Sequence, residues 1–187
     1  KRAIGFGGHI PDLPEDFRVP LGKAAVRRSG KDLTIVTWGR CTLFCNEAVA
    51  KLAQDGVDCE LLDMRTIVPP DMDAVLASVR KTGRLLVVHE DRVFSSLGRE
   101  IQGAVHEAMR GEHVISRVLG QDAVPGIPSP VHVEEAIVVS PEKVYRAALE
   151  VMGQRKAQAA VAAPVEAPRG AYTRPQILWT PSRNFVT

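Results

Sequence analysis

A pair of prolines directly after a buried strand constrains the fold of this chain more than any other feature of its sequence. Residues 57–62 (VDCELL) alternate apolar and polar side chains and then become apolar, as expected for a strand buried in a sheet. Pro69 and Pro70 can continue neither a ladder nor a helix, so the strand must end before them. Asp71 stands where an N-cap belongs, ahead of the helical pattern of residues 72–76. The segment therefore predicts a strand, a stiff turn and the start of a helix.

Two oppositely charged side chains flank the start of this turn. Asp63 directly follows the strand, and Arg65 stands two residues later. Both would lie where the strand leaves the sheet. We expect the two side chains to pair and to tie the turn to the edge of the sheet.

Strand and helix patterns alternate along the rest of the chain. We expect strands at residues 23–28, 33–37, 57–62, 84–89 and 114–119. We expect helices at residues 43–53, 72–82 and 97–109 and from residue 141 onward. Ser140 should cap the last of these, with Pro141 at its first position. Such alternation predicts a three-layer α/β/α domain with a mostly parallel sheet. Residues 33–37, 60–62 and 85–88 should be its central strands, with residues 23–28 as an antiparallel edge strand.

Composition divides the 187 residues into three parts. Residues 1–17 are rich in glycine and proline and are expected to form a linker or arm. Residues 18–153 should form the α/β domain. Residues 154–187 begin as an Ala/Pro-rich linker and end in an aromatic tail, which would pack on its own domain or reach a partner subunit. This tail carries five basic residues against one acidic residue, so the rest of the chain is net acidic.

Several classes of protein are excluded or disfavoured by the sequence. No apolar run approaches the length that crosses a membrane, and no cluster of Lys and Arg with interleaved aromatics indicates nucleic-acid binding. The three cysteines favour a reducing compartment over a disulfide framework. Cys41 and Cys45 are expected to be small buried hydrophobes, because a metal site would need further ligands close by. The chain begins with Lys1 and is expected to be a piece of a longer protein.

Two loops could carry chemistry, because ligands bind α/β sheets at the carboxyl ends of their strands. Residues 39–42 (GRCT) could offer free helix N–H groups to an anion, with Arg40 adding charge. His89 is followed by Glu90 and Asp91, so it could act as a general acid or base; a structural or interface role is the alternative. The remaining histidines show no metal-ligand spacing, and we expect no metal site.

The segment 63–71 (DMRTIVPPD) resembles the Asp-x-Arg-Thr-(Ile/Leu)-x-Pro-x-Asp signature of the C-terminal domain of the transketolase superfamily, in particular the β subunit of thiamine-diphosphate-dependent 2-oxo acid dehydrogenases. Other stretches agree with that family in the same order: residues 19–24, 32–39, 86–91 and 130–136. The signature positions in this chain are Asp63, Arg65, Thr66, Pro69 and Asp71. The resemblance covers about residues 18–152 and implies a fold like that of the transketolase C-terminal domain.

The resemblance also implies a function. The parent protein would perform oxidative decarboxylation of a 2-oxo acid and pass the acyl group to lipoyl, and this chain would be its C-terminal assembly and partner-docking domain. Residues 89–91 (HED) are closer to the branched-chain enzymes, whereas residues 94–98 and 121–128 depart from the family pattern. Pyruvate dehydrogenase, acetoin dehydrogenase and transketolase-type parents remain alternatives. Outside the family, a free-standing α/β module that binds an anion or small ligand also remains.

Cofactors and partners follow from the same resemblance. The parent would bind thiamine diphosphate and Mg²⁺, but the Gly-Asp-Gly…Asn element for them is missing here, so this fragment should neither bind them nor catalyse alone. Its partners would be the other decarboxylase subunits, the dihydrolipoyl acyltransferase core and further copies of itself. The compartment would be the bacterial cytoplasm or the mitochondrial matrix.

One carboxylate is our candidate for docking the core component. The binding domain of that component is typically basic in this family, so its dock should be acidic. Asp122 follows the last predicted strand, in a loop interrupted by proline and glycine that should leave the side chain exposed. We expect Asp122 to contact the core component; an ordinary solvated loop aspartate is the alternative.

Overall fold

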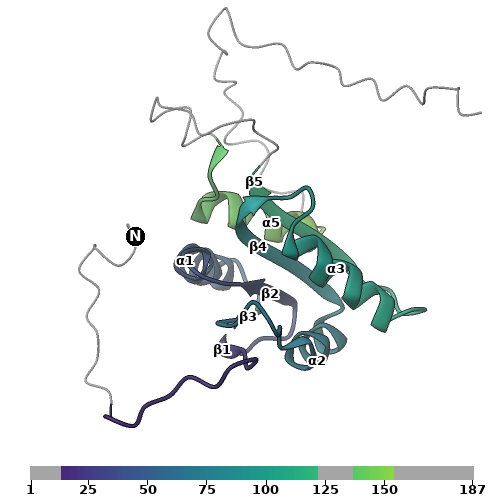
Figure 1. Ribbon diagram of the computed structural model, residues 1–187. Helices are drawn as coiled ribbons and strands as arrows, with labels where there is room; N and C mark the ends of the chain where they lie inside the picture. Colours follow the sequence, from purple (N-terminus) through teal and green to yellow (C-terminus); the bar gives the residue numbers. More distant parts are fainter. Residues whose placement is uncertain (1–13, 122–136, 154–187) are drawn as a thin grey trace, which may run out of the picture. The chain divides into compact units, whose positions relative to one another are not determined.

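The expected α/β order of strands and helices is present in the computed structural model of the chain, which describes residues 14–121 and 137–153 (Figure 1). The strands are β1 (Ala25–Arg28), β2 (Leu33–Thr37), β3 (Cys59–Asp63), β4 (Arg84–Arg92) and β5 (Ile115–Gln121). The described residues include the helices α1 (Cys41–Gln54), α2 (Met72–Thr82), α3 (Leu97–Ala108) and α5 (Pro141–Val151).

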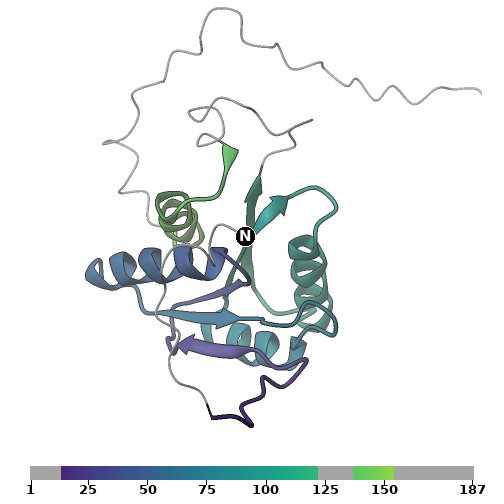
Figure 2. The same ribbon diagram turned by 60° about the vertical axis from the view of Figure 1, so that its left-hand side comes forward.

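The sheet in this part of the chain has the strand order β1-β3-β2-β4-β5. β3, β2, β4 and β5 pair in parallel, and β1 pairs antiparallel to β3. Helices α1 and α5 cover one face, while α2 and α3 cover the other (Figures 1 and 2). The predicted fold class, three layers with a mostly parallel sheet and one antiparallel edge strand, is therefore confirmed.

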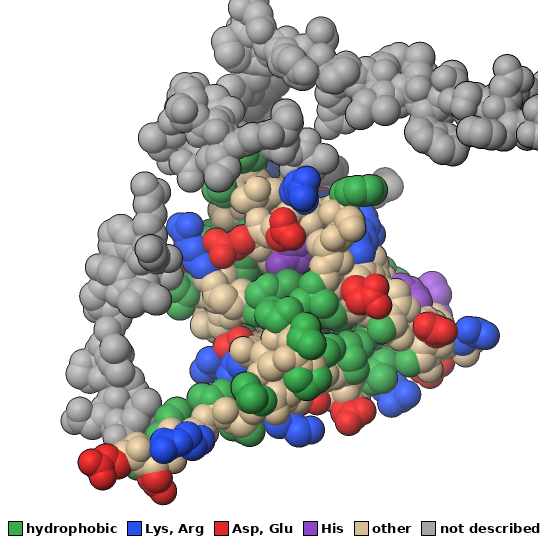
Figure 3. Space-filling view, viewed as in Figure 1, with side chains coloured by type: hydrophobic (Ala, Val, Ile, Leu, Met, Phe, Trp, Pro, Cys, Tyr) green, Lys and Arg blue, Asp and Glu red, His purple; other side chains and the backbone are tan. Residues whose placement is uncertain are grey.

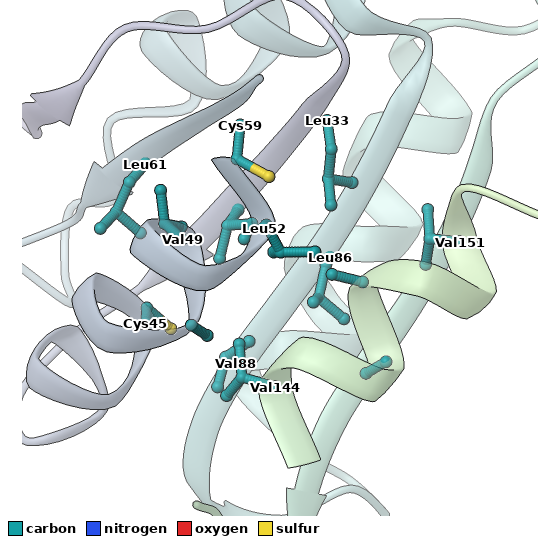
Figure 4. Close-up of a cluster of buried hydrophobic side chains, with 14 of the residues drawn as sticks. Leu33, Cys45, Val49, Leu52, Cys59, Leu61, Leu86, Val88, Val144 and Val151 are labelled. Carbon is teal, nitrogen blue, oxygen red and sulfur yellow. The ribbon is translucent and has the colours of Figure 1, made fainter. Parts of the chain in front are cut away.

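Burial on both faces explains why the central strands are apolar throughout. All five residues of β2 are buried. Leu33 and Ile35 pack with α1 and α5, whereas Val36 packs with α2 and α3, because successive side chains of a strand point to opposite faces. Figure 4 shows the first of these cores, where Leu52 of α1 and Val144 of α5 lie over the sheet. Each face thus has its own apolar cluster.

Two predicted helix starts have the expected caps. The carboxylate of Asp71 accepts a hydrogen bond from Ala74 N at 3.3 Å at the start of α2. The hydroxyl of Ser140 accepts one from Lys143 N at 3.3 Å, ahead of Pro141 at the start of α5. Each cap satisfies one of the N–H groups that a helix leaves free at its first turn.

The boundaries differ from the predictions where polar residues remain in regular structure. β4 was expected to end at His89, but it continues through Arg92 because the ladder resumes at the pair Arg92–Gln121 after an irregularity. The intervening Glu90 and Asp91 are exposed, so their polarity indicated a loop. Helix α1 likewise begins two residues earlier than expected, at Cys41.

No helix in residues 14–121 or 137–153 combines the length and apolar character needed to cross a membrane.

We predict that Gly30 tolerates no side chain. A Cβ built there would lie 2.3 Å from the carbonyl carbon of Cys59 and 2.5 Å from Glu60 N, and these backbone atoms belong to β3. Gly30→Ala should therefore destabilise the domain by roughly 1–3 kcal/mol in urea denaturation, as overpacking typically does. The control is Gly103→Ala in α3, where nothing lies within 4 Å and alanine should stabilise by about 0.5–1 kcal/mol. Equal effects would contradict the prediction.

Candidate functional site: the strap clamp and the histidine socket

The signature turn (residues 63–71) lies beside residues 21–24, which lead into β1 and which we call the strap. Arg65 connects the two segments. Its guanidinium donates hydrogen bonds to the carbonyl oxygen of Lys23 at 2.8 and 3.1 Å, and to that of Ala24 at 3.3 Å. The backbone of Arg65 has φ +53°, a left-handed conformation that is uncommon for a residue with a side chain. The turn therefore holds the strap through backbone groups, which any strap sequence would offer.

Two more signature side chains bind backbone N–H groups of the strap. The hydroxyl of Thr66 accepts from Gly22 N at 3.1 Å. The carboxylate of Asp71 accepts from Ala24 N at 2.9 Å with one oxygen, while the other oxygen caps α2. Only 7% of Asp71 is exposed, so these bonds are shielded from water. One carboxylate thus fastens both the strap and the helix.

Pro69 packs closely against the strap at Gly22. A Cβ added to Gly22 would lie 3.1 Å from Pro69 Cγ, and Gly22 has φ +67°. Both the space and the backbone conformation favour glycine at this position. The strap can pass this close to the turn because it carries no side chain there.

Asp63 and Arg65 both tie the turn to the edge of the sheet, but the expected side-chain pair between them does not form. The carboxylate of Asp63 accepts instead from the guanidinium of Arg27 in β1, at 2.6 and 3.1 Å, and from the backbone N–H of Arg65 at 3.2 Å. The sequence could not show this because Arg27 lies 36 residues away and reaches Asp63 only through antiparallel pairing of the edge strand.

His89 sits in a socket at the carboxyl end of β4. Its side chain is 1% exposed and stacks on Trp38, with ring centroids 5.5 Å apart and an interplanar angle of 13°. Two glycines make room for the ring. A Cβ on Gly98 would lie 2.5 Å from His89 Nε2, and one on Gly120 would lie 2.8 Å from Cε1. Sequence reasoning missed both glycines, although each interrupts a helix or strand pattern.

The buried imidazole is held in its neutral form. Neither ring nitrogen has a well-formed hydrogen-bond partner among the described residues. Burial lowers the pKa of His89, while the charge of Asp91 opposes the shift. The low exposure of the ring, 1%, favours the structural alternative for His89 over a general acid or base.

Arg40, in the turn that follows β2, contacts side chains of its own domain. Nη1 of Arg40 lies 4.0 Å from Oε1 of Glu90, and its guanidinium lies 4.9 Å above the ring of Phe44. Helix α1 has no side-chain cap, but the N–H groups of Thr42 and Leu43 in its first turn already donate to the carbonyl oxygens of Gly39 and Arg40. The cation expected to attract an anion is also directed towards a carboxylate and an aromatic ring.

The thiols behave as hydrophobic side chains. Cys41, Cys45 and Cys59 are fully buried, and burial raises the pKa of each thiol to about 12. They are therefore protonated and unreactive near neutral pH. Within residues 14–121 and 137–153, no group of three or more His, Cys, Asp or Glu side chains could hold a metal ion. Asp122, our docking candidate, lies outside the described residues.

Comparison with known proteins shows the family. The family described as "Transketolase, C-terminal domain" matches residues 22–144, and this chain belongs to it. A solved structure described as a split gene transketolase, inactive beta4 tetramer, matches with a TM-score of 0.65 and 26% identity, covering 79% of this chain and 48% of that one. The fold and the signature turn therefore agree with the family assignment.

Three similar proteins with curated names are β subunits of dehydrogenases. The 2-oxoisovalerate dehydrogenase subunit beta 2, mitochondrial, of Arabidopsis thaliana is 41% identical over 116 residues, which cover 60% of this chain and 32% of the relative. The corresponding beta subunit of Bacillus subtilis is 34% identical, covering 77% and 44%. A pyruvate dehydrogenase E1 component subunit beta of Porphyra purpurea is 35% identical, covering 78% and 44%. The chain thus spans less than half the length of these relatives.

We predict that Asp71 contributes more to the stability of the domain than an ordinary helix cap does. Asp71→Ala removes both the cap of α2 and the acceptor for Ala24 N. It should therefore lower the free energy of unfolding by roughly 2–4 kcal/mol. Ser140→Ala is the matched control, because it removes the cap of α5 and should cost about 1 kcal/mol. Urea titrations measure both. Equal losses would show that the strap contact contributes nothing.

We also predict that His89 makes the domain less stable in acid. Its pKa is lowered in the folded state, so the unfolded chain binds the proton more readily. Stability should therefore fall as the pH drops through about 6.5, the ordinary histidine pKa, and should stop falling below the folded-state pKa. Urea titrations of the unmodified chain and of His89→Phe at pH 7.5 and 5.5 isolate this effect. An identical pH dependence in both proteins would contradict the prediction.

Proposed function

We propose that this chain is the C-terminal assembly and partner-docking domain of the decarboxylating component of a 2-oxo acid dehydrogenase complex, with a branched-chain 2-oxo acid as substrate. The observation that carries the proposal is the similarity to 2-oxoisovalerate dehydrogenase β subunits, at 34–41% identity, over the part of the chain that folds as the transketolase C-terminal domain. The relatives are subunits by name, which supports a role in contact with other chains.

The parent component would use thiamine diphosphate and Mg²⁺, held outside this domain. The sequence lacks the Gly-Asp-Gly…Asn element that binds them, and the buried thiols and enclosed imidazole offer no reactive group to a substrate. The domain would contribute instead through its surface. The parent would transfer the acyl group to lipoyl on the dihydrolipoyl acyltransferase core.

Partners and compartment complete the proposal. The domain would contact the other subunits of the decarboxylase component, the acyltransferase core and a second copy of itself. Relatives from a plant and a fungus are named as mitochondrial, and others are bacterial, which supports the mitochondrial matrix or the bacterial cytoplasm as the compartment.

Substrate preference tests the proposal directly. We expect the component that contains this chain to decarboxylate 2-oxoisovalerate with a kcat/KM at least about ten-fold above that for pyruvate, a difference of about 1.4 kcal/mol in transition-state binding. The 187-residue chain alone should show no activity and no heat of thiamine diphosphate binding in calorimetry.

A preference for pyruvate or acetoin would move the assignment to the enzymes that those relatives represent, since pyruvate and acetoin enzymes also match this chain at 32–46% identity. Saturable thiamine diphosphate binding by the chain alone would overturn the assignment as an assembly and docking domain.

Docking of the acyltransferase core tests the partner. We expect Asp122→Asn to weaken binding to the purified subunit-binding domain of the core by roughly 1–3 kcal/mol at low salt, because one partner of a charged interface pair is lost. The difference should shrink as ionic strength rises. Asp16→Asn, at an exposed site ahead of the strap, is the control. Equal affinities for Asp122→Asn and the unmodified chain at low salt would remove Asp122 from the dock.

A further inference from the structure

Three apolar side chains are exposed where the strap meets the signature turn. Leu21 is 83% exposed and Val68 is 80% exposed, with Ile67 at 40%. We call these three residues the apolar strip. Figure 3 shows hydrophobic side chains along the segment that leads into β1 and over the middle of the same face. Exposed apolar side chains that occur together, rather than singly, mark interaction surfaces.

The hydrogen bonds from Arg65, Thr66 and Asp71 to residues 22–24, which we call the clamp, bring the two halves of the strip together. Gly22 follows Leu21 in the chain, and Pro69 follows Val68. Gly22 is bonded to Thr66, and its Cα faces Pro69 closely enough that an added Cβ would lie 3.1 Å away. The strip is therefore a single surface built from segments more than 40 residues apart, and its shape depends on the bonds of the clamp.

The clamp also fixes the direction from which the chain enters the domain. The N–H groups of Gly22 and Ala24 and the carbonyl groups of Lys23 and Ala24 are all bonded to the signature turn. A segment held at this many consecutive backbone groups cannot swing about its own axis. The chain thus enters the domain directly beside the strip.

The length of the relatives indicates what that polypeptide is. The match covers 26–44% of the 2-oxoisovalerate dehydrogenase β subunits, and the matched family is a C-terminal domain. Most of each relative therefore precedes the part that this chain represents. We propose that the apolar strip is the surface on which the polypeptide that precedes this domain in the decarboxylating component packs, and we call this surface the seat. Arg65, Thr66 and Asp71 are then positioning residues that hold the seat in shape.

The surroundings of the strip fit a permanent contact. Its centre is apolar, and charged groups lie at its margin, where Lys23 approaches Asp71 at 3.9 Å and Arg27 pairs with Asp63. An apolar centre with a charged rim is the usual composition of a protein interface. The inference rests on the proposed function, because it assumes a preceding domain in the same component.

Hydroxyl-radical footprinting with mass spectrometry tests the seat. We compare the labelling of side chains in the 187-residue chain with that in the intact component. Leu21 and Val68 should be labelled at least five-fold more slowly in the component, whereas Leu43, which is 53% exposed on α1, should be labelled equally in both. Unchanged labelling of Leu21 and Val68 would overturn the proposal.

Two further measurements separate the remaining outcomes. Leu21→Ser should lower the thermal midpoint of the intact component more than Leu43→Ser does, while both variants should leave the thermal midpoint of the isolated chain nearly unchanged.

The second measurement is the self-association of the isolated chain. If the chain self-associates and Leu21→Ser abolishes this, the proposal is overturned, because the strip would then pair two copies. Thiamine-dependent activity of the component is measured separately. If the strip is protected in a component that has no such activity, the proposed function is refuted but the contact between the strip and the preceding polypeptide is confirmed.

Discussion

The carboxylate of Asp71 is shared between two parts of the fold, and much of the structure depends on this arrangement. One oxygen caps α2, and the other holds Ala24, so the helix on one face and the edge strand cannot shift independently. Arg65 and Thr66 extend the same contact along the strap. Because the bonds run to backbone groups, they fix the path of the chain through the strap, where the close approach of Pro69 favours glycine at position 22. The signature positions of the family are in this sense a device for joining, and none of them offers a reacting group to solvent.

In this domain, aromatic side chains stand at the carboxyl ends of β2 and β4. In open α/β sheets ligands bind where neighbouring strands send their helices to opposite faces. Here β2 leads to α1 and β4 leads to α3, on opposite faces, and the space between the strand ends is occupied by Trp38 stacked on His89. The charged groups above it, Arg40 and Glu90, face each other. The position at which related folds bind ligands is thus filled by the chain itself.

Sequence patterns predicted the layers, the antiparallel edge and the caps at Asp71 and Ser140, because these depend on local periodicity and on residues close in the chain. They did not predict the partner of Asp63, which comes from the register between β1 and β3. They also missed the socket of His89, because Gly98 and Gly120 each interrupt a local pattern but nothing in the sequence shows that both face the same ring. Contacts between segments far apart in sequence decided every such case. Polarity at Glu90 likewise indicated a loop where the strand in fact continues.

Native-state hydrogen exchange tests the central claim, that the signature turn locks the strap to the sheet. The amides of Gly22 and Ala24 are bonded to Thr66 and Asp71, so they should exchange only when the whole domain unfolds, as slowly as the amides of β2. Their exchange should respond to low concentrations of urea as the β2 amides do. Fast exchange at Gly22 and Ala24 that is insensitive to urea would show that the strap opens by itself, and would contradict the account.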